Sequence, residues 1–293
     1  MPVMVCKFSI KDLEKLSGVK AHTLRIWEQR YGILKPSRTD TNIRWYCNEE
    51  LKNILNVSLL NNHGYKISKI AELSNTEIAT EVSKIVDSEI NECEQVTSLI
   101  ISMVEMDEQR FEKIISNQIL RHGFAHTIEE VVYPFLHKIG VMWQTGSINP
   151  AQEHFITNLI RQKLIVAIDG QVTTETIDSK KFLLFLPESE LHEISLLYFT
   201  YLLKSRGHVP TYLGQSVPLL DVQKVVEIKN SDYIVSVITF AMESTQDYVN
   251  QLANSFPTKK ILLTGYQIIS RELTLPSNIK IFKTPAELIA LVS

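Results

Sequence analysis

The sequence lacks the features that define several large classes of protein. Its three cysteines, Cys6, Cys47 and Cys93, stand far apart and form no metal-ligand spacing, so a disulfide framework is not expected. No apolar run approaches the roughly 20 residues that span a bilayer, and the start shows no pattern of a secretory signal. We therefore expect a cytoplasmic protein without membrane segments, and its 293 residues favour two or three compact domains.

Charge is distributed unevenly, although the formal total is only −3. Residues 1–74 carry 12 Lys and Arg against 7 Asp and Glu, whereas the rest of the chain carries 18 against 26. A basic segment on an acidic body suggests that one end meets a polyanion. Ordinary scatter is the alternative explanation, and charge alone does not decide between them.

Three regions differ in their pattern of apolar residues. Residues 1–75 hold short helical patterns, residues 76–175 are almost entirely helical in pattern, and residues 180–293 alternate strand-like runs with amphipathic segments. A polar stretch over residues 172–181 predicts a loop between the last two. The pattern predicts a small helical domain, a four-helix bundle and a doubly wound parallel sheet.

The first region predicts a helix-turn-helix followed by a hairpin. Ser9 is placed to cap a helix that a turn at Gly18 ends, and a second helix follows over residues 21–31. Residues 35–46 place basic side chains on both sides of a polar turn, which is typical of a β-hairpin wing. A generic four-helix domain with a charged surface is the alternative. The combination is more specific than either part and favours DNA binding.

The same residues resemble a known family. Residues 21–32 (AHTLRIWEQRYG), the later Pro36-x-Arg38 and Arg44-Trp45-Tyr46 are similar to the DNA-binding domain of MerR-type regulators. The resemblance implies that the second helix lies in the major groove and that the hairpin contacts phosphates. Pattern and resemblance together place these residues at double-stranded DNA: His22, Thr23, Arg25, Arg30, Arg38, Arg44 and Tyr46.

The middle region has apolar residues at helical spacing, with Gly123 and Pro134 expected to interrupt the helices. Asn149-Pro150 predicts the start of a helix, with Asn149 as its cap. Trp143 before this start and Glu153-His154 after it could face one cavity, although such residues are more often ordinary core and surface positions. A spacer or dimerising bundle is the simplest interpretation of the region.

The last region predicts buried strands at residues 182–187, 208–214, 233–239, 260–264 and 279–282, with helices between them. Ligands of such sheets bind beyond the carboxyl ends of the strands. His192 lies in the loop after the first strand and is a candidate metal ligand, which Glu190 could orient. A lone histidine there is more often structural or solvated.

Here too the residues resemble a family. Residues 190–195 (ELHEIS) are similar to the Asp/Glu-x-His-x-x-Gly motif of cobalamin-binding domains, and residues 213–218 and 236–238 to two further segments of that family. Trp143 with Glu153-His154 is similar to the helical cap of CarH-like photoreceptor repressors of the MerR family. The resemblance implies that His192 ligates cobalt and that a cobalamin, of which adenosylcobalamin is one form, contacts Trp143, Glu153, His154, Glu190, His192, Gly214, Ser236 and Gly265.

Three positions depart from the cobalamin-binding pattern. Ser195 replaces the motif glycine, Thr264 replaces the first of two glycines, and Gln144 stands where light-sensing members carry a histidine. Since glutamine supplies no imidazole, we expect light-driven switching less than cofactor binding.

Three hypotheses of function follow. The first is a homo-oligomeric DNA-binding regulator, not an enzyme, in which cobalamin binding is coupled to oligomerisation and operator affinity. The second is a cofactor-free MerR-type regulator that a protein partner controls. The third is a component of a cobalamin-dependent enzyme, which is disfavoured because the chain has no room for a substrate barrel of about 200 residues.

Overall fold

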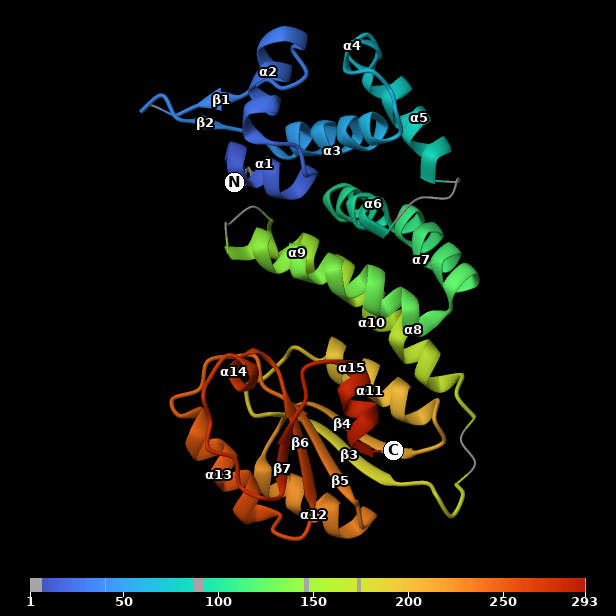
Figure 1. Ribbon diagram of the computed structural model, residues 1–293, viewed down its shortest axis with the longest axis vertical. Coiled ribbons are helices and arrows are strands. Elements are labelled where there is room, and N and C mark those ends of the chain that lie inside the picture. The colour runs from blue at the N-terminus through green and yellow to red at the C-terminus, as the bar shows by residue number, and fades with distance from the viewer. Residues whose placement is uncertain (1–6, 40, 87–91, 145–147, 173–174, 293) are drawn as a thin grey trace. The chain divides into compact units, whose positions relative to one another are not determined.

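The computed structural model describes residues 7–39, 41–86, 92–144, 148–172 and 175–292 (Figure 1). Contacts between residues divide the chain into two compact units, Met1–Leu159 and Ile160–Ser293. Over its described residues the first unit is helical apart from one small hairpin, and the second unit contains a parallel sheet.

The first unit begins with a helix-turn-helix. Ser9 and Asp12 form a reciprocal capping box at the start of its first helix, and Gly18 ends that helix in the left-handed conformation (φ +74°). A two-stranded antiparallel hairpin follows the second helix. The elements of this N-terminal part are α1 (Ile10–Ser17), α2 (Ala21–Tyr31), β1 (Ser37–Arg38), β2 (Arg44–Trp45), α3 (Asn48–Asn62), α4 (Ile67–Ile70) and α5 (Asn75–Val86).

The expected boundary at residue 75 coincides with the start of α5, which packs against α3. Ile78 and Val82 of α5 are buried, so this helix extends the core of the N-terminal part. The remaining helices of the unit are α6 (Glu92–Glu105), α7 (Glu108–His122), α8 (Phe124–His126), the π-helix η1 (Thr127–Val132), α9 (Tyr133–Gln144) and α10 (Pro150–Asp169), which runs on into the second unit.

Pro134 corrects one expectation for this helical region. Gly123 ends α7 as predicted, but the chain stays helical from α8 through η1 into α9, so Pro134 does not interrupt it. Proline lacks the N–H for a helical hydrogen bond and its ring clashes with the carbonyl four residues earlier. The wider π-helical turn directly before it, in which the Tyr133 N–H bonds to the Ile128 carbonyl, accounts for its tolerance here.

The second unit is built on a five-stranded parallel sheet, counted within the described residues, with the order β4-β3-β5-β6-β7. This arrangement confirms the predicted doubly wound fold. Helices α12 and α13 cover one face of the sheet and α11 and α15 the other (Figure 1). The elements are β3 (Lys181–Pro187), α11 (Ile194–Lys204), β4 (Val209–Val217), α12 (Leu219–Lys229), β5 (Tyr233–Val237), α13 (Thr245–Ser255), β6 (Lys260–Thr264), α14 (Tyr266–Ile269), β7 (Ile279–Ile281) and α15 (Pro285–Val292).

The strand order creates a switch point between β3 and β5. From β3 the chain turns to one side to form β4 and then crosses back to form β5 on the other side. The loops that leave the carboxyl ends of β3 and β5 therefore diverge, and a crevice at such a point is the usual ligand site of the fold. Residues 188–193 and 238–244 form these two loops.

Candidate functional site

The outer face of α2 carries most of the side chains predicted to meet DNA. Leu24 and Trp27 are buried against the rest of the N-terminal part. His22, Arg25 and Arg30 are exposed and Thr23 is half-buried, as is expected for an amphipathic helix with a polar outer face. The helix can thus present its basic side chains to a polyanion without any change in its own packing.

The two arginines of the hairpin differ in their surroundings. Arg38 is exposed, and its Nη1 donates to Oδ1 of Asn42 at 2.6 Å. Asn42 adopts a left-handed conformation (φ +65°), which asparagine tolerates, in the turn between the strands. Arg44 is one-third exposed, and its Nε donates to Oε1 of Glu28 at 3.1 Å. The charge of Arg38 is therefore more accessible than that of Arg44.

Tyr46 is not on this surface, which corrects the prediction that it contacts DNA. Its side chain is completely buried, its backbone pairs with Phe8, and its hydroxyl donates to Oε2 of Glu28 at 3.2 Å. Burial, together with the charge of Glu28, raises the pKa of Tyr46 to about 12. Tyr46 instead anchors Glu28, which in turn positions Arg44.

A second candidate site lies at the switch point of the sheet, where Glu190 joins the two diverging loops. Its side chain is fully buried and Oε2 accepts the backbone N–H groups of Thr239 and Phe240 at 2.6 and 2.9 Å. The hydroxyl of Thr239 donates to the same oxygen at 2.7 Å. The loop after β3 is thus fixed to the loop after β5.

The other carboxylate oxygen of Glu190 holds His192. Oε1 lies 2.6 Å from Nδ1 of the imidazole and accepts the backbone N–H of His192 at 3.0 Å. The His192 side chain is 73 % exposed, so a buried carboxylate orients an imidazole at the surface of the carboxyl edge. This is the pairing that fixes the tautomer and direction of a metal-ligating histidine.

The hydrogen bonds also set the charge of Glu190. Burial by itself would raise the pKa of this carboxyl group. Hydrogen bonds from His192, Thr239 and Phe240 outweigh the effect of burial and hold the pKa of Glu190 well below its usual range. The group is therefore an anion at neutral pH and remains an acceptor for all of its partners.

Glu193 of the same loop has a different role. It is buried and accepts hydrogen bonds from Arg161 of α10 and from the hydroxyl of Tyr212 on β4. Burial and the bond to Glu193 raise the pKa of Tyr212 well above its usual value. No local signal in the sequence marks Glu193 or Arg161, because their pairing spans 32 residues and joins a loop to a helix.

Three further predicted cofactor residues lie in the same unit. Gly214 stands in an irregular part of β4 with φ +86°. Ser236 is fully buried on β5, and its hydroxyl donates to the Phe185 carbonyl of β3 at 2.9 Å. Gly265 follows β6, and a Cβ there would lie 2.4 Å from the Ile238 carbonyl oxygen. Ser236 and Gly265 therefore both serve the packing of the sheet.

Two of the three departures from the cobalamin-binding pattern, Ser195 and Thr264, lie in the unit that contains the sheet. Ser195 is half-buried in the first turn of α11, and Thr264 is buried at the end of β6. Each adds a side chain where the family pattern has glycine. The side chain of Gln144 lies outside the described residues.

The predicted helical-cap residues belong to the first unit. Asn149 caps α10 as predicted, since its Oδ1 accepts the Gln152 N–H at 2.9 Å. His154 is exposed, and its Nδ1 lies 2.8 Å from Oε2 of Glu153. Trp143, on α9, is 45 % exposed. The pair Glu153–His154 repeats on a helix the carboxylate–imidazole contact of Glu190 and His192.

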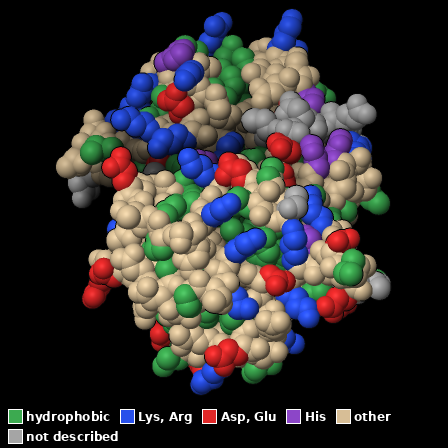
Figure 2. All heavy atoms as spheres, turned by 60° about the horizontal axis from the view of Figure 1, so that its bottom comes forward, with side chains coloured by type: hydrophobic (Ala, Val, Ile, Leu, Met, Phe, Trp, Pro, Cys, Tyr) green, Lys and Arg blue, Asp and Glu red, His purple; other side chains and the backbone are tan. Residues whose placement is uncertain are grey.

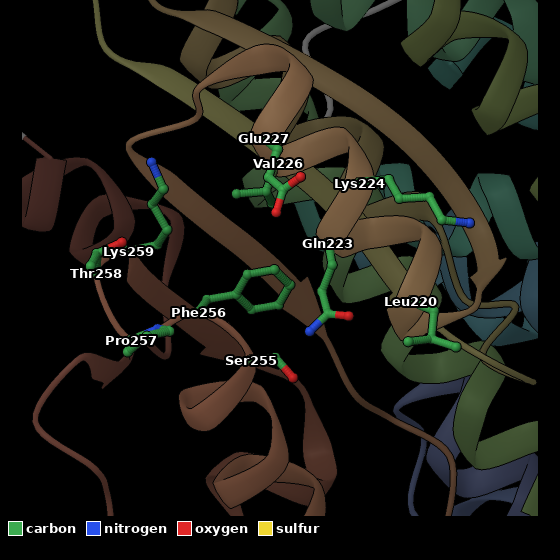
Figure 3. A pocket seen from close by; sticks show the side chains of 10 residues that line it. All are labelled: Leu220, Gln223, Lys224, Val226, Glu227, Ser255, Phe256, Pro257, Thr258 and Lys259. Atoms are coloured by element: carbon green, nitrogen blue, oxygen red, sulfur yellow. The ribbon is translucent and has the colours of Figure 1, made fainter.

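A cavity of about 500 Å³ in the second unit contains none of the predicted site residues. It is lined by α12 and by the segment that precedes β6, and Figure 3 shows Phe256 and Gln223 pointing into it.

On the face that Figure 2 displays, basic and acidic side chains are interspersed. Among the described residues, no helix could cross a membrane, and no three His, Cys, Asp or Glu side chains gather into a metal site.

Two segments of the chain match known families. Residues 8–77 match the family of MerR HTH family regulatory proteins, and residues 96–167 match the family described as a B12 binding domain. The helical bundle that carries Trp143, Glu153 and His154 therefore has the pattern of a cobalamin-binding domain.

Two relatives span most of the chain. The HTH-type transcriptional repressor CarH of Myxococcus xanthus is 26% identical over 252 residues, which are 84% of this chain and 83% of that protein. CarA of the same organism is 26% identical over 217 residues, which are 73% of this chain and 70% of that protein. In fold, the chain is similar to the monomethylamine corrinoid protein of Methanosarcina barkeri (TM-score 0.53, 15% identity), over 66% of this chain and 94% of that one.

Proposed function

We propose that this chain, a CarH-like regulator of the MerR family, is a transcription regulator that binds double-stranded DNA through α2 and the hairpin and binds a cobalamin beside His192. The observation that carries the cofactor part is the buried carboxylate of Glu190 holding an exposed imidazole at 2.6 Å. The DNA part rests on the exposed basic face of α2 and on the match of residues 8–77 to MerR regulators.

The residues at the carboxyl edge of the sheet fit a metal-centred macrocycle that contacts this edge. Glu190 engages Nδ1 of His192, so Nε2 is the nitrogen that would ligate cobalt. When bound, a cobalamin would supply a cobalt ion that can accept an imidazole nitrogen as a ligand and carry a second, exchangeable ligand. His192 would ligate the cobalt, and Gly214 would border the cofactor. The finer assignment to adenosylcobalamin rests on the resemblance to CarH-like repressors.

Cofactor binding would regulate DNA binding through association of chains. Two copies held together present two helix-turn-helix units to two half-sites, so the second contact forms at high effective concentration. We expect the cobalamin-bound protein to be the homo-oligomer with the higher operator affinity. A monomer with and without cobalamin in analytical ultracentrifugation would contradict this part of the proposal.

The cofactor proposal is tested with purified protein, kept in the dark and incubated with cobalamins that carry different upper ligands. After desalting, the wild type is expected to retain visible absorbance with the signature of imidazole coordination. His192→Ala is expected to lose that signature, whereas Glu188→Ala, an exposed change in the same loop, should keep it. Absorbance retained by no sample, for any upper ligand, would reject the cofactor part.

Two observations favour a second candidate function, a cofactor-free regulator controlled by a protein partner. The hydroxyl of Ser236 donates its hydrogen bond within the sheet, and Thr264 fills a buried position where the cobalamin pattern has glycine. DNA binding that His192→Ala leaves unchanged in the presence of cobalamin would support this alternative. A change that depends on both His192 and cobalamin would reject it.

A further inference from the structure

One apolar side chain lies in the middle of the basic face of α2. Ile26 is 50 % exposed, although Leu24 and Trp27 on the opposite side are almost completely buried. Successive residues of an α-helix advance by about 100°. His22, Ile26 and Gln29 consequently form the central outer stripe of the helix, and Arg25 and Arg30 flank it on its two sides.

The surroundings of Ile26 indicate what would cover it. Isolated apolar residues are common on protein surfaces and need no partner. Ile26, however, is bordered by exposed basic and polar side chains, in the part of the chain with 12 Lys and Arg against 7 Asp and Glu. The flanking arginines are complementary to the phosphates on the two sides of a groove, so the occupant that fits this face is double-stranded DNA.

The apolar group that a major groove offers is the C5-methyl of thymine. We propose that Ile26 is a specificity-determining residue, which packs against a thymine methyl while Arg25 and Arg30 contact phosphates. This inference rests on the proposed binding of DNA by α2. It assigns sequence readout to a side chain that has no charge and no hydrogen-bonding group.

The test removes the methyl group alone. A duplex selected from a random library by the full-length chain is resynthesised with single thymines replaced by deoxyuridine, and dissociation constants are measured by fluorescence anisotropy. We expect one position at which the wild type loses about fourfold in affinity, the gain from burying one methyl group. Ile26→Ala should bind the original duplex with a similar loss and show no further loss at that position.

Ile43 offers a matched control, since it is a 64 % exposed isoleucine on the hairpin side of the same N-terminal part. Ile43→Ala should keep the fourfold response to deoxyuridine, and Ile26→Ala should keep the wild-type salt dependence. Both changes are at exposed positions, and circular dichroism checks that both variants fold.

The outcomes separate the inference from the function on which it rests. If Arg25→Ala weakens binding but no thymine responds to loss of its methyl, the role of Ile26 is overturned and DNA binding by α2 stands. An equal deoxyuridine response in the wild type and in Ile26→Ala overturns it as well. A wild type that selects no duplex from the library would refute the proposed function itself.

Discussion

Glu28 and Glu190 each hold a side chain predicted to be functional, but by different means. Glu28, on α2, is 12 % exposed at its side chain and accepts hydrogen bonds from two side chains, Arg44 and Tyr46. Glu190 is fully buried and accepts from the backbones of two loops as well as from side chains. Glu28 thus holds the hairpin against α2, whereas Glu190 holds two loops of the sheet together.

The two carboxylates differ in how far each organises its site before a ligand binds. Arg44 is held by a partly exposed ion pair, which solvent and salt screen. His192 is held by a carboxylate whose partners leave it little freedom to move. We therefore expect substitutions of Glu190 to change both the stability of the fold and the position of the His192 imidazole. Around Glu28, we expect substitution of Tyr46 to lower stability and substitution of Arg44 to lower DNA affinity.

The largest effect is expected for Glu190→Ala. The change leaves the Thr239 and Phe240 N–H groups without their acceptor, and each buried unsatisfied donor costs about 1–3 kcal/mol. We expect the free energy of unfolding, measured by urea denaturation, to fall by about 3 kcal/mol. Glu188→Ala, at an exposed position two residues earlier, is the control and should stay near the wild type. Equal values for the two variants would mean that Glu190 does not fasten the loops.

A smaller, pH-dependent effect is expected from the same carboxyl group. Its pKa is depressed in the folded state, while the unfolded chain takes up the proton near the usual value of about 4.3. Its contribution to stability is therefore complete above about pH 5 and is lost as the pH falls below that range. The difference in unfolding free energy between the wild type and Glu190→Gln should shrink between about pH 5 and pH 3. A difference that grows on acidification would contradict the depressed pKa.

Next in size is Tyr46→Phe, which tests the corrected role of this residue. Loss of the hydroxyl removes one hydrogen bond to the carboxylate of Glu28, so the unfolding free energy should fall by about 1 kcal/mol. DNA affinity measured at constant salt should change by less than about twofold once the protein is folded. A large loss of affinity with unchanged stability would return Tyr46 to the DNA interface.

The smallest effect distinguishes the two arginines of the hairpin. Arg38→Ala should reduce the slope of log affinity against log salt by about 1, as for the loss of one phosphate contact. Arg44→Ala should reduce it by less, because Glu28 already offsets part of the Arg44 charge. Salt titrations of both variants on one duplex measure the two slopes, and a larger change for Arg44→Ala would reverse the assignment.

Local patterns predicted the elements of both units, because apolar periodicity and caps act over a few residues. The strands around residues 182–187 and 260–264, the cap at Asn149 and the break at Gly123 all follow from such signals. The prediction that Pro134 interrupts the helix was wrong, because no simple sequence pattern marks the π-helical turn that accommodates the proline.

The contacts within the sites were less predictable. Tyr46 looks like a wing residue in sequence, and only its bond to Glu28, 18 residues away, identifies it as core. The bonds from Thr239 and Phe240 to Glu190 span 49 and 50 residues. They exist because the strand order brings the ends of β3 and β5 together, and no spacing rule along the chain expresses that order.

The close approach of Ile238 to Gly265 bears on how cofactor loss could be recognised among related proteins. A β-carbon at position 265 would collide with main-chain atoms, so this glycine would persist even in related proteins that had lost cobalamin binding. Metal ligation is the proposed role of the imidazole at position 192, which is 73 % exposed, so that position would be freer to change once selection for ligation ceased. Genomic surveys for surviving corrin sensors should therefore weigh position 192 above position 265.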